Sequence, residues 1–256
     1  MFRGVIQRDA LTVFLDDYLT CASYDDYAPN GMQVEGKPEI HRICTAVTAS
    51  LDIIQRANHL KADALLVHHG YFWRGEDAVL TGMKRQRVGS IMSHDLNLLS
   101  YHLPLDCHQE LGNNACIGRL LEVKNITLHT AGKIPNVLWA GHFESSVAPT
   151  AMMHQLSSIF QRKPLHVSGT TKKIKRMAWC SGGAQDFIPD AHRLGVDAYI
   201  SGEISERTYY QAQELGIHYF ACGHHATERF GIQALGELIS KRFGLTHQFL
   251  DTDNPV

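Results

Sequence analysis

The chain has 256 residues, of which 44% are apolar and 20% are charged, and its formal net charge is −2. These values are typical of a globular protein with one large domain or two small ones and a sizeable core. The near-neutral charge excludes a global field that would attract nucleic acid or an anionic membrane. Arg3, Arg8 and Asp9 interrupt any apolar signal region, and no apolar run could span a bilayer, so we expect a cytoplasmic protein.

The six cysteines are scattered, without the C-x-x-C spacing of a zinc ribbon and without the pattern of a disulfide framework. A reducing compartment fits this usage. The 16 histidines stand out, and they do not form one tract. The question that they raise is which of them converge in space.

The first third of the chain predicts a strand–helix–strand unit with parallel strands. An amphipathic helix with Asp9 as its N-cap is expected first, followed by a turn-rich loop that could fold over a cleft. The expected elements are a helix over 9–20, a loop over 24–36, a strand over 43–47, a helix from the cap Ser50 to Leu60, and a strand over 62–67.

This last strand runs directly into His68, His69 and Gly70. Adjacent residues of a regular strand face opposite ways, so both imidazoles can serve one site only if the strand ends there and the backbone turns. Gly70 allows such a turn. The pair therefore indicates two ligands delivered to a cleft, although polar groups hydrogen-bonded near the surface would give the same pattern.

A helix over 83–94, with Met83, Val88, Ile91 and Met92 on its apolar side, leads to an apolar segment over 96–105. Strand alternation there places His102, Pro104 and Asp106 on one face. His102 and Asp106 would be about 13 Å apart in an extended strand. Asp106, at the strand end, is the better ligand candidate.

We expect an α/β protein of two interlinked lobes with mixed, largely parallel sheets. The expected lobes are a metal-site lobe over 1–126, a second inserted lobe over 127–215, and a return to the first over 216–256. Within them, residues 53–66 and 187–200 share apolar, Ala, Leu and Asp-Ala positions. This weak repeat predicts two similar strand–helix–strand units, although any helix that feeds a buried strand has a similar pattern.

A second short strand, over 218–222, runs into another histidine pair, and His224 and Glu228 are four residues apart at a helix start. That spacing puts both side chains on one helical face. Together the candidates are three imidazoles and two carboxylates: His68, His69, Asp106, His224 and Glu228. Imidazole and carboxylate suit zinc, iron, manganese or nickel. Five side chains exceed what one catalytic zinc takes, which favours two ions sharing a bridging carboxylate. Taken one at a time, Glu228 could be a helix N-terminal carboxylate that interacts favourably with the helix dipole, and His224 could be a capping or solvent-exposed residue.

On these residues the sequence resembles the Nif-three-like family, also called GTP cyclohydrolase 1 type 2 homologues, in its short bacterial branch. The matching segments, in the family's order, are Asp26–Gly31 with Gln33–Gly36, Val67–Gly70, Tyr101–Asp106, Ser201–Glu203 and Gly223–Glu228. The resemblance implies a dinuclear site built from the five candidate ligands, with Glu228 as the bridge. It also implies a ring-shaped homohexamer whose sites face an interior cavity.

These observations favour a metal-dependent hydrolase that binds two divalent ions of zinc, iron or manganese and acts on a nucleotide-like or cyclic-amide small molecule. His102 is the expected catalytic proton shuttle, or else a hydrogen-bonded residue that orients Asp106. Glu203 could line the cavity, and Tyr71, Phe72 and Trp73 could stack on a base or form a core cluster.

The alternative is a non-enzymatic metal-binding protein or a ring-shaped adaptor, since no phosphate-binding loop or nucleophile motif is present. A weaker option is nucleic-acid handling, against which the near-neutral charge argues. The basic cluster at Lys172, Lys173, Lys175 and Arg176 is explained as a solvated strand entry. An open coordination position would favour the hydrolase over the adaptor.

Overall fold

The computed structural model describes residues 4–256, so the first three residues of the expected first lobe lie outside the described part. The chain divides into two compact units. The first comprises the residues up to Leu105 together with Gly231–Thr252, and the second comprises Asp106–Phe230 and Asp253–Val256. The chain passes from one unit to the other inside two helices, α4 (Leu103–Cys107) and α10 (Arg229–Phe243), and again between Thr252 and Asp253.

The first unit is built on a five-stranded sheet in the order β13-β4-β5-β6-β2. The strands β13, β4, β5 and β6 are parallel, and β2 is antiparallel at the edge. The strands are β2 (Gly31–Val34), β4 (Arg42–Thr48), β5 (Ala64–His69), β6 (Asn97–Ser100) and β13 (Thr246–Phe249), with a separate two-stranded ribbon of β1 (Ile6–Gln7) and β3 (Glu39–Ile40).

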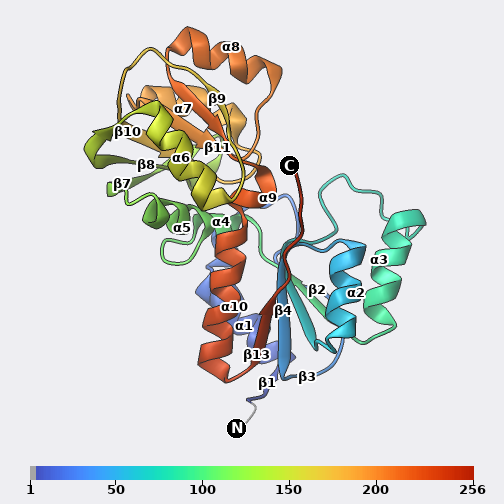
Figure 1. Ribbon diagram of the computed structural model, residues 1–256. Helices are drawn as coiled ribbons and strands as arrows, with labels where there is room; N and C mark the ends of the chain where they lie inside the picture. Colours follow the sequence, from blue (N-terminus) through green and yellow to red (C-terminus); the bar gives the residue numbers. More distant parts are fainter. Residues whose placement is uncertain (1–3) are drawn as a thin grey trace. The chain divides into compact units, whose positions relative to one another are not determined.

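Helices cover both faces of this sheet. Figure 1 shows α2 (Leu51–His59) and α3 (Gly82–Met92) on one side and α1 (Arg8–Tyr18) with α10 on the other. The core under α2 and α3 contains Ile53, Ile54 and Ala57 of α2 and Val88 and Ile91 of α3. Burial of these apolar side chains is the main force that holds the helices on the sheet.

The second unit has a six-stranded sheet in the order β7-β8-β10-β11-β12-β9, in which β10, β11 and β12 are parallel and the outer strands antiparallel. The strands are β7 (Lys124–Ala131), β8 (Ile134–Val147), β9 (Leu165–Val167), β10 (Ile174–Trp179), β11 (Ala198–Ser201) and β12 (His218–Ala221). This mixed pairing confirms the expected fold class.

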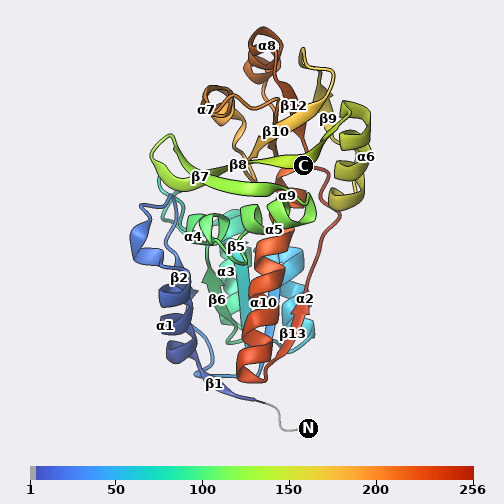
Figure 2. The same cartoon turned by 90° about the vertical axis from the view of Figure 1, so that its left-hand side faces the viewer.

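The helices of the second unit are α5 (Asn113–Leu120), α6 (Pro149–Phe160), α7 (Ile188–Arg193), α8 (Glu206–Leu215) and α9 (His224–Thr227). Each unit also has a short 3-10 helix, η1 (Cys21–Ser23) in the first and η2 (Gln185–Phe187) in the second. Figure 2 shows α6 and the pair α7 and α8 on opposite sides of the second sheet. The main core joins α5 and α6 to the sheet through Met152, Leu156, Phe160, Trp139 and Trp179. Pro149 occupies the first turn of α6, where its missing N–H costs no hydrogen bond.

The compact units divide at 105/106, 230/231 and 252/253, whereas the expected lobes divide at 126/127 and 215/216. Two elements explain the difference. Ala115 and Ile117 of α5 belong to the core of the second unit. Likewise β12 pairs with β11 and β9 in the second sheet.

Several local predictions are confirmed and others are wrong. The Ser50 hydroxyl caps α2 by accepting a hydrogen bond from Ile53 N at 3.3 Å, as predicted. Asp9 is not the N-cap of α1; that position is Gln7. Met83 and Met92, expected to face inward, are 62% and 61% exposed. Among residues 4–256, none of the helices combines the length and apolar character needed to cross a membrane.

The structure contains the two similar strand–helix–strand units that the weak repeat predicts. The order β2, β4, α2, β5, α3, β6 of the first unit recurs as β9, β10, α7, β11, α8, β12 in the second. The sheet orders also agree, as β4-β5-β6-β2 and β10-β11-β12-β9. The sequence alignment of the repeat sets Ala64 opposite Ala198, and these two residues begin β5 and β11.

The two units also share one hydrogen-bonding device, in which an aspartate just before a strand binds the entry of the neighbouring strand. Asp63 Oδ2 accepts from the backbone N–H groups of His41 and Arg42, each at 3.0 Å. Asp197 Oδ2 accepts from Lys175 N and Arg176 N at 2.8 and 2.9 Å. The carboxylate in each case satisfies backbone donors where the ladder begins.

Replacing Asp63 with alanine should lower the free energy of unfolding by about 1–2 kcal/mol, because two backbone N–H donors at the strand entry and the Lys37 ammonium would lose their acceptor. Burial raises the pKa of Asp63, but its hydrogen bonds with Lys37 and the backbone outweigh burial and lower it. The loss of stability in Asp63→Ala should therefore be complete above about pH 4, the ordinary pKa of an aspartate, and should become smaller as the pH falls through the lowered pKa of Asp63. Urea denaturation measures it, with the exposed Asp52→Ala as the control. An equal effect in the control would contradict the assignment.

Candidate metal centre

The first unit brings three imidazoles together, those of His68, His69 and His102. One donor atom from each lies within 4.8 Å of the others. The ring centroids of His68 and His69 are 4.6 Å apart, and the ring of His102 lies 5.0 Å from His68 and 5.7 Å from His69. His68 is fully buried, while His69 and His102 are half-buried.

His68 and His69 are the last two residues of β5, and Gly70 is the first residue after the strand. Gly70 serves close packing rather than a left-handed turn. A Cβ at this position would lie 2.1 Å from Gln33 Oε1 and 2.8 Å from Ser100 Cβ. Any side chain would thus displace the Gln33 side chain and crowd Ser100 of β6, the strand that pairs with β5.

The expected strand through His102, Pro104 and Asp106 is wrong. Strand β6 ends at Ser100, and the next residues form the short helix α4 (Leu103–Cys107). Pro104 is compatible with this helix because it lies in its first turn, where no intrahelical donor is needed. His102 therefore lies in the turn between β6 and α4, and strand alternation does not link it to Asp106.

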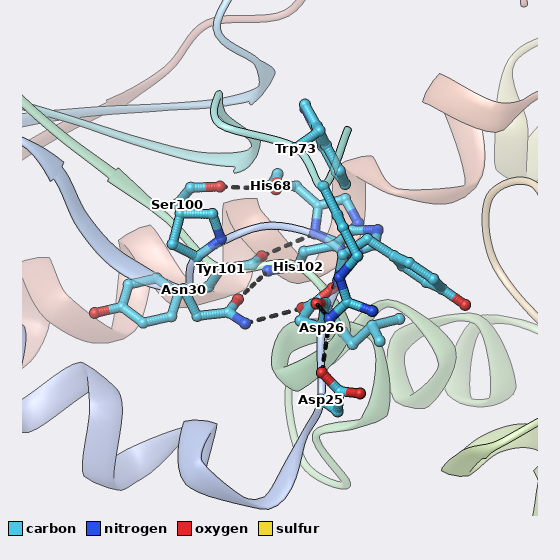
Figure 3. A network of polar contacts seen from close by, with 12 residues as sticks. Asp25, Asp26, Asn30, His68, Trp73, Ser100, Tyr101 and His102 are labelled. Carbon is cyan, nitrogen blue, oxygen red and sulfur yellow. Dashed lines mark hydrogen bonds and ion pairs between the residues drawn. The ribbon is translucent and has the colours of Figure 1, made fainter. Parts of the chain in front are cut away.

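Asp26 binds His102. In Figure 3, the carboxylate of Asp26 lies against the imidazole, and Oδ1 is 2.7 Å from Nδ1 of His102. Asp26 Oδ2 accepts from the backbone N–H of Leu103 and from the side-chain amide of Asn30, each at 2.9 Å. Burial raises the pKa of Asp26, but the hydrogen bonds with His102 and Asn30 and the charge of His102 outweigh it and hold the carboxyl ionised.

Aromatic side chains border this imidazole group. The ring of Trp73 meets His102 edge to face with centroids 5.0 Å apart, and it lies 6.0 Å from the ring of His69. Tyr27, half exposed, lies 6.3 Å from His102. Tyr71 is instead a core residue, whose hydroxyl donates to Ala49 O. Of the predicted aromatic triplet, Trp73 thus lies beside the imidazoles, Tyr71 belongs to the core, and Phe72 is 40% exposed.

The second unit brings together Asp106, His224 and Glu228. Oxygen atoms of Asp106 and Glu228 lie within 4.8 Å of each other. His224 Nε2 is 3.2 Å from Glu228 Oε2, and its Nδ1 is 2.6 Å from Glu203 Oε1. The expected continuous helix is broken here, since α9 ends at Thr227 and α10 begins at Arg229. Asp106 and Glu228 are only 6% and 2% exposed.

Backbone and side-chain groups hold these carboxylates in place. Asp106 Oδ1 accepts from Asn113 Nδ2 and from Ser181 Oγ, each at 2.8 Å. Gly182, with φ +67°, lets the chain pass directly beside Glu228. A Cβ on Gly182 would lie 2.1 Å from Glu228 Oε1. The carboxylates therefore have fixed positions, as metal ligands require.

The charges around His224 control its protonation in the metal-free protein. Burial alone would lower its pKa, but the hydrogen bonds and negative charges of Glu228 and Glu203 outweigh burial and raise the pKa to about 9. Since the folded-state pKa is raised, this contact stabilises the metal-free protein fully below pH 6.5 or so. That contribution is lost as the pH rises through about 9. Metal binding to this imidazole must release its proton.

Replacing Glu203 with glutamine should lower the pKa of His224 by about one to two units in the metal-free protein, because one neighbouring negative charge disappears. Titration of the His224 ring signals by NMR measures this change. Asp186→Asn, which removes an exposed carboxylate paired with Arg207 in the same unit, should leave the pKa unchanged. An unshifted His224 in Glu203→Gln would show that Glu203 does not act on it.

Sequence reasoning missed three residues that support the centre: Asp26, Ser181 and Gly182. Asp26 lay inside a motif without an assigned role. Ser181 and Gly182 follow strand β10 directly, in a Ser-Gly-Gly run. A glycine pair at the carboxyl end of a buried parallel strand was the signal that could have pointed to them.

A sequence model of the family Duf34/NIF3 (NGG1p interacting factor 3) matches residues 6–255. The chain belongs to this family. Its relatives include a Vibrio cholerae protein, 48% identical over 96% of this chain and 98% of its own, and an Escherichia coli K12 protein, 45% identical over 98% of this chain and all of its own. Both are named GTP cyclohydrolase 1 type 2 homolog.

The solved structure of protein ybgI, described as of unknown function, has the same fold as this Duf34/NIF3 protein. Its TM-score is 0.93 at 42% identity, and the match covers 98% of this chain and all of that one. The expected family and fold are thus confirmed. The names of the relatives state what they are homologous to, and no reaction follows from them for this chain.

The donor set fits divalent metal ions. The donors are three imidazoles and two carboxylates, the ligands that zinc, iron and manganese share in proteins. His68, Asp106 and Glu228 are buried, and His69 and His224 are partly buried. Two carboxylates as close as Asp106 and Glu228 repel each other when buried and ionised, and a cation between them would remove this repulsion. The His, Asp and Glu groups could therefore hold metal ions.

Proposed function

We propose that the chain is a hydrolase with a dinuclear metal centre whose ligands are His68, His69, Asp106, His224 and Glu228. The observation that carries the proposal is the pair of buried carboxylates, Asp106 and Glu228, with donor oxygens within 4.8 Å of each other. A divalent cation between the two carboxylates would neutralise their mutual repulsion. Glu228, which also contacts His224, is the proposed bridging ligand.

Two ions suit the number of ligands better than one. A single catalytic zinc takes three protein side chains and a water, whereas five side chains and a bridging carboxylate serve two ions. His68 and His69 would supply one imidazole to each ion. The proposed metals are zinc, iron or manganese, all of which accept imidazole nitrogen together with carboxylate oxygen.

The bound ions would supply a water of lowered pKa and would stabilise negative charge that develops on the substrate. The residues of the chain would position this chemistry. Ser181 and Asn113 orient Asp106 by donating hydrogen bonds to it. Glu203 fixes the ring of His224 through its contact with Nδ1.

The proposed substrate is a nucleotide-like or cyclic-amide small molecule. The relatives named GTP cyclohydrolase 1 type 2 homolog support this class, and so do the rings of Trp73 and Tyr27 beside His102, which offer surfaces for a planar base. A water attacking an electrophilic carbon or phosphorus of such a molecule would complete the reaction.

Metal-dependent turnover tests the proposal. Protein freed of metal by chelation and then reloaded should hydrolyse at least one member of a panel of nucleotides and cyclic amides. Glu228→Ala should abolish that turnover, while His59→Ala, an exposed histidine of α2, should leave it intact. A protein that binds two ions and hydrolyses no member of the panel would favour the alternative, a non-enzymatic metal-binding or adaptor protein.

We also propose that the chain forms a ring-shaped homohexamer. Exposed apolar side chains around α3 support an assembly, since Val79, Leu80 and Met83 are 54%, 48% and 62% exposed and would be covered at a subunit contact. Light scattering during size-exclusion chromatography should give six times the chain mass. A monomer at micromolar concentration would refute the ring.

A further inference from the structure

His102 is outside the five proposed ligands, yet it lies as close to His68 and His69 as a third ligand would. The three donor atoms are within 4.8 Å of one another, and all three residues belong to the first unit. The rings arrive from two elements, the end of β5 and the turn after β6. Imidazole nitrogen is a common ligand of zinc and related ions, so a third imidazole at this distance can extend the ligand set of the centre.

Hydrogen bonds set the tautomers of two of these rings. His68 Nδ1 is 2.9 Å from the backbone oxygen of Tyr101, and His102 Nδ1 is 2.7 Å from Asp26 Oδ1. A carbonyl and a carboxylate accept only, so Nδ1 carries the proton in both rings. In the neutral form Nε2 then presents its lone pair, and Nε2 is the atom that would bind an ion. His69 Nδ1 is likewise engaged, 3.1 Å from Thr48 Oγ1.

Hydrogen bonds on both oxygens fix the Asp26 carboxylate, which in turn holds the His102 ring in one orientation. The side chain of Asp26 is 3% exposed, and both of its oxygens accept hydrogen bonds. They come from His102 Nδ1 and Tyr27 N on Oδ1, and from Asn30 Nδ2 and Leu103 N on Oδ2. Asn30 Oδ1 in turn accepts from the backbone N–H of His102 at 2.8 Å (Figure 3). A carboxylate on the remote nitrogen is the usual support of a histidine that binds metal.

We propose that His102, oriented by Asp26, is a sixth ligand of the metal centre and binds through Nε2. The inference depends on the metal centre of the proposed function. It replaces the predicted proton shuttle with a ligand role, and Asp26 becomes a positioning residue. The three neutral imidazoles of His68, His69 and His102 favour zinc, iron, cobalt or nickel. They disfavour magnesium and calcium, which prefer oxygen ligands.

Cobalt(II) binding tests the proposal, because the visible spectrum of the ion reports its ligands. Metal-free protein is titrated with Co²⁺ for the wild type, His102→Ala and Asp26→Asn, with His59→Ala as the matched control. Loss of the ligand should weaken the binding of one ion by at least about 100-fold, and Asp26→Asn should weaken it by about 10-fold to 100-fold. The saturated spectrum of His102→Ala should differ from that of the wild type. Circular dichroism melting checks that each variant folds.

Added imidazole should restore the wild-type spectrum to His102→Ala and leave His59→Ala unchanged. Wild-type affinity and spectrum in His102→Ala would overturn the ligand role. Weaker binding with an unaltered spectrum at saturation would also overturn it, because it would show support without coordination. A wild-type protein that binds no Co²⁺ at all would refute the proposed metal centre itself, so the two failures are distinguishable.

Discussion

Gly182→Ala is expected to weaken metal binding by at least about tenfold, the effect of misplacing one ligand. The added Cβ would lie 2.1 Å from Glu228 Oε1 and 3.2 Å from His224 Nε2, so it would displace the proposed bridging carboxylate. The backbone conformation at φ +67° would add a strain of about 1–2 kcal/mol. Equilibrium dialysis with Zn²⁺ and urea denaturation measure the two effects.

The neighbouring glycine provides a matched control. A Cβ on Gly183 would meet Glu203 and His224 at 3.6 Å, which is ordinary contact, and its φ is not in the left-handed region. Gly183→Ala should therefore bind metal almost as the wild type does. If Gly182→Ala retained full affinity while Gly183→Ala lost it, the placement of Glu228 would be wrong.

Asn114→Ala is expected to lower the free energy of unfolding by about 2–4 kcal/mol, because it leaves several buried backbone groups without partners. The side chain is fully buried. Its Oδ1 accepts from Ser181 N at 2.9 Å, and its Nδ2 donates to Asp106 O at 3.2 Å. The same substitution should reduce metal affinity, since Asn114 joins the segment of Asp106 to that of Ser181, whose hydroxyl binds the Asp106 carboxylate.

Thermal and urea unfolding of the metal-free protein isolate the stability effect from metal binding. Asn254→Ala, at an exposed position near the C-terminal end, serves as the control and should change the unfolding free energy by less than about 0.5 kcal/mol. An Asn114→Ala protein as stable as this control would show that the hydrogen bonds of Asn114 are dispensable.

Local patterns were sufficient to predict much of the fold. Apolar runs that end in histidine identified β5 and β12, and helical periodicity identified α1 and α2, because both signals depend on residues that are neighbours in sequence. The repeat between 53–66 and 187–200 also marked real counterparts, down to the first residues of β5 and β11. The hairpin of β7 and β8 was not recognised from the sequence.

The candidate ligands could be proposed from sequence because each follows a strand or begins a helix, where function gathers in α/β proteins. The residues that hold these ligands in place could not be proposed from the sequence. Asp26 reaches His102, and Ser181 reaches Asp106, across 76 and 75 residues, and no periodic pattern links such positions. The helix at Leu103–Cys107 was missed because an apolar segment too short for helical periodicity resembles a strand.

Metal stoichiometry is the measurement that tests the proposed centre most directly. Protein purified without a His-tag or added metal is analysed by mass spectrometry for metal, beside His68→Ala, Glu228→Ala and the control His59→Ala. A shared dinuclear centre predicts about two ions per chain in the wild type and the control. It also predicts a sharp loss in both ligand variants, which remain folded. A wild-type chain without metal, even after reconstitution with zinc, iron or manganese, would contradict it.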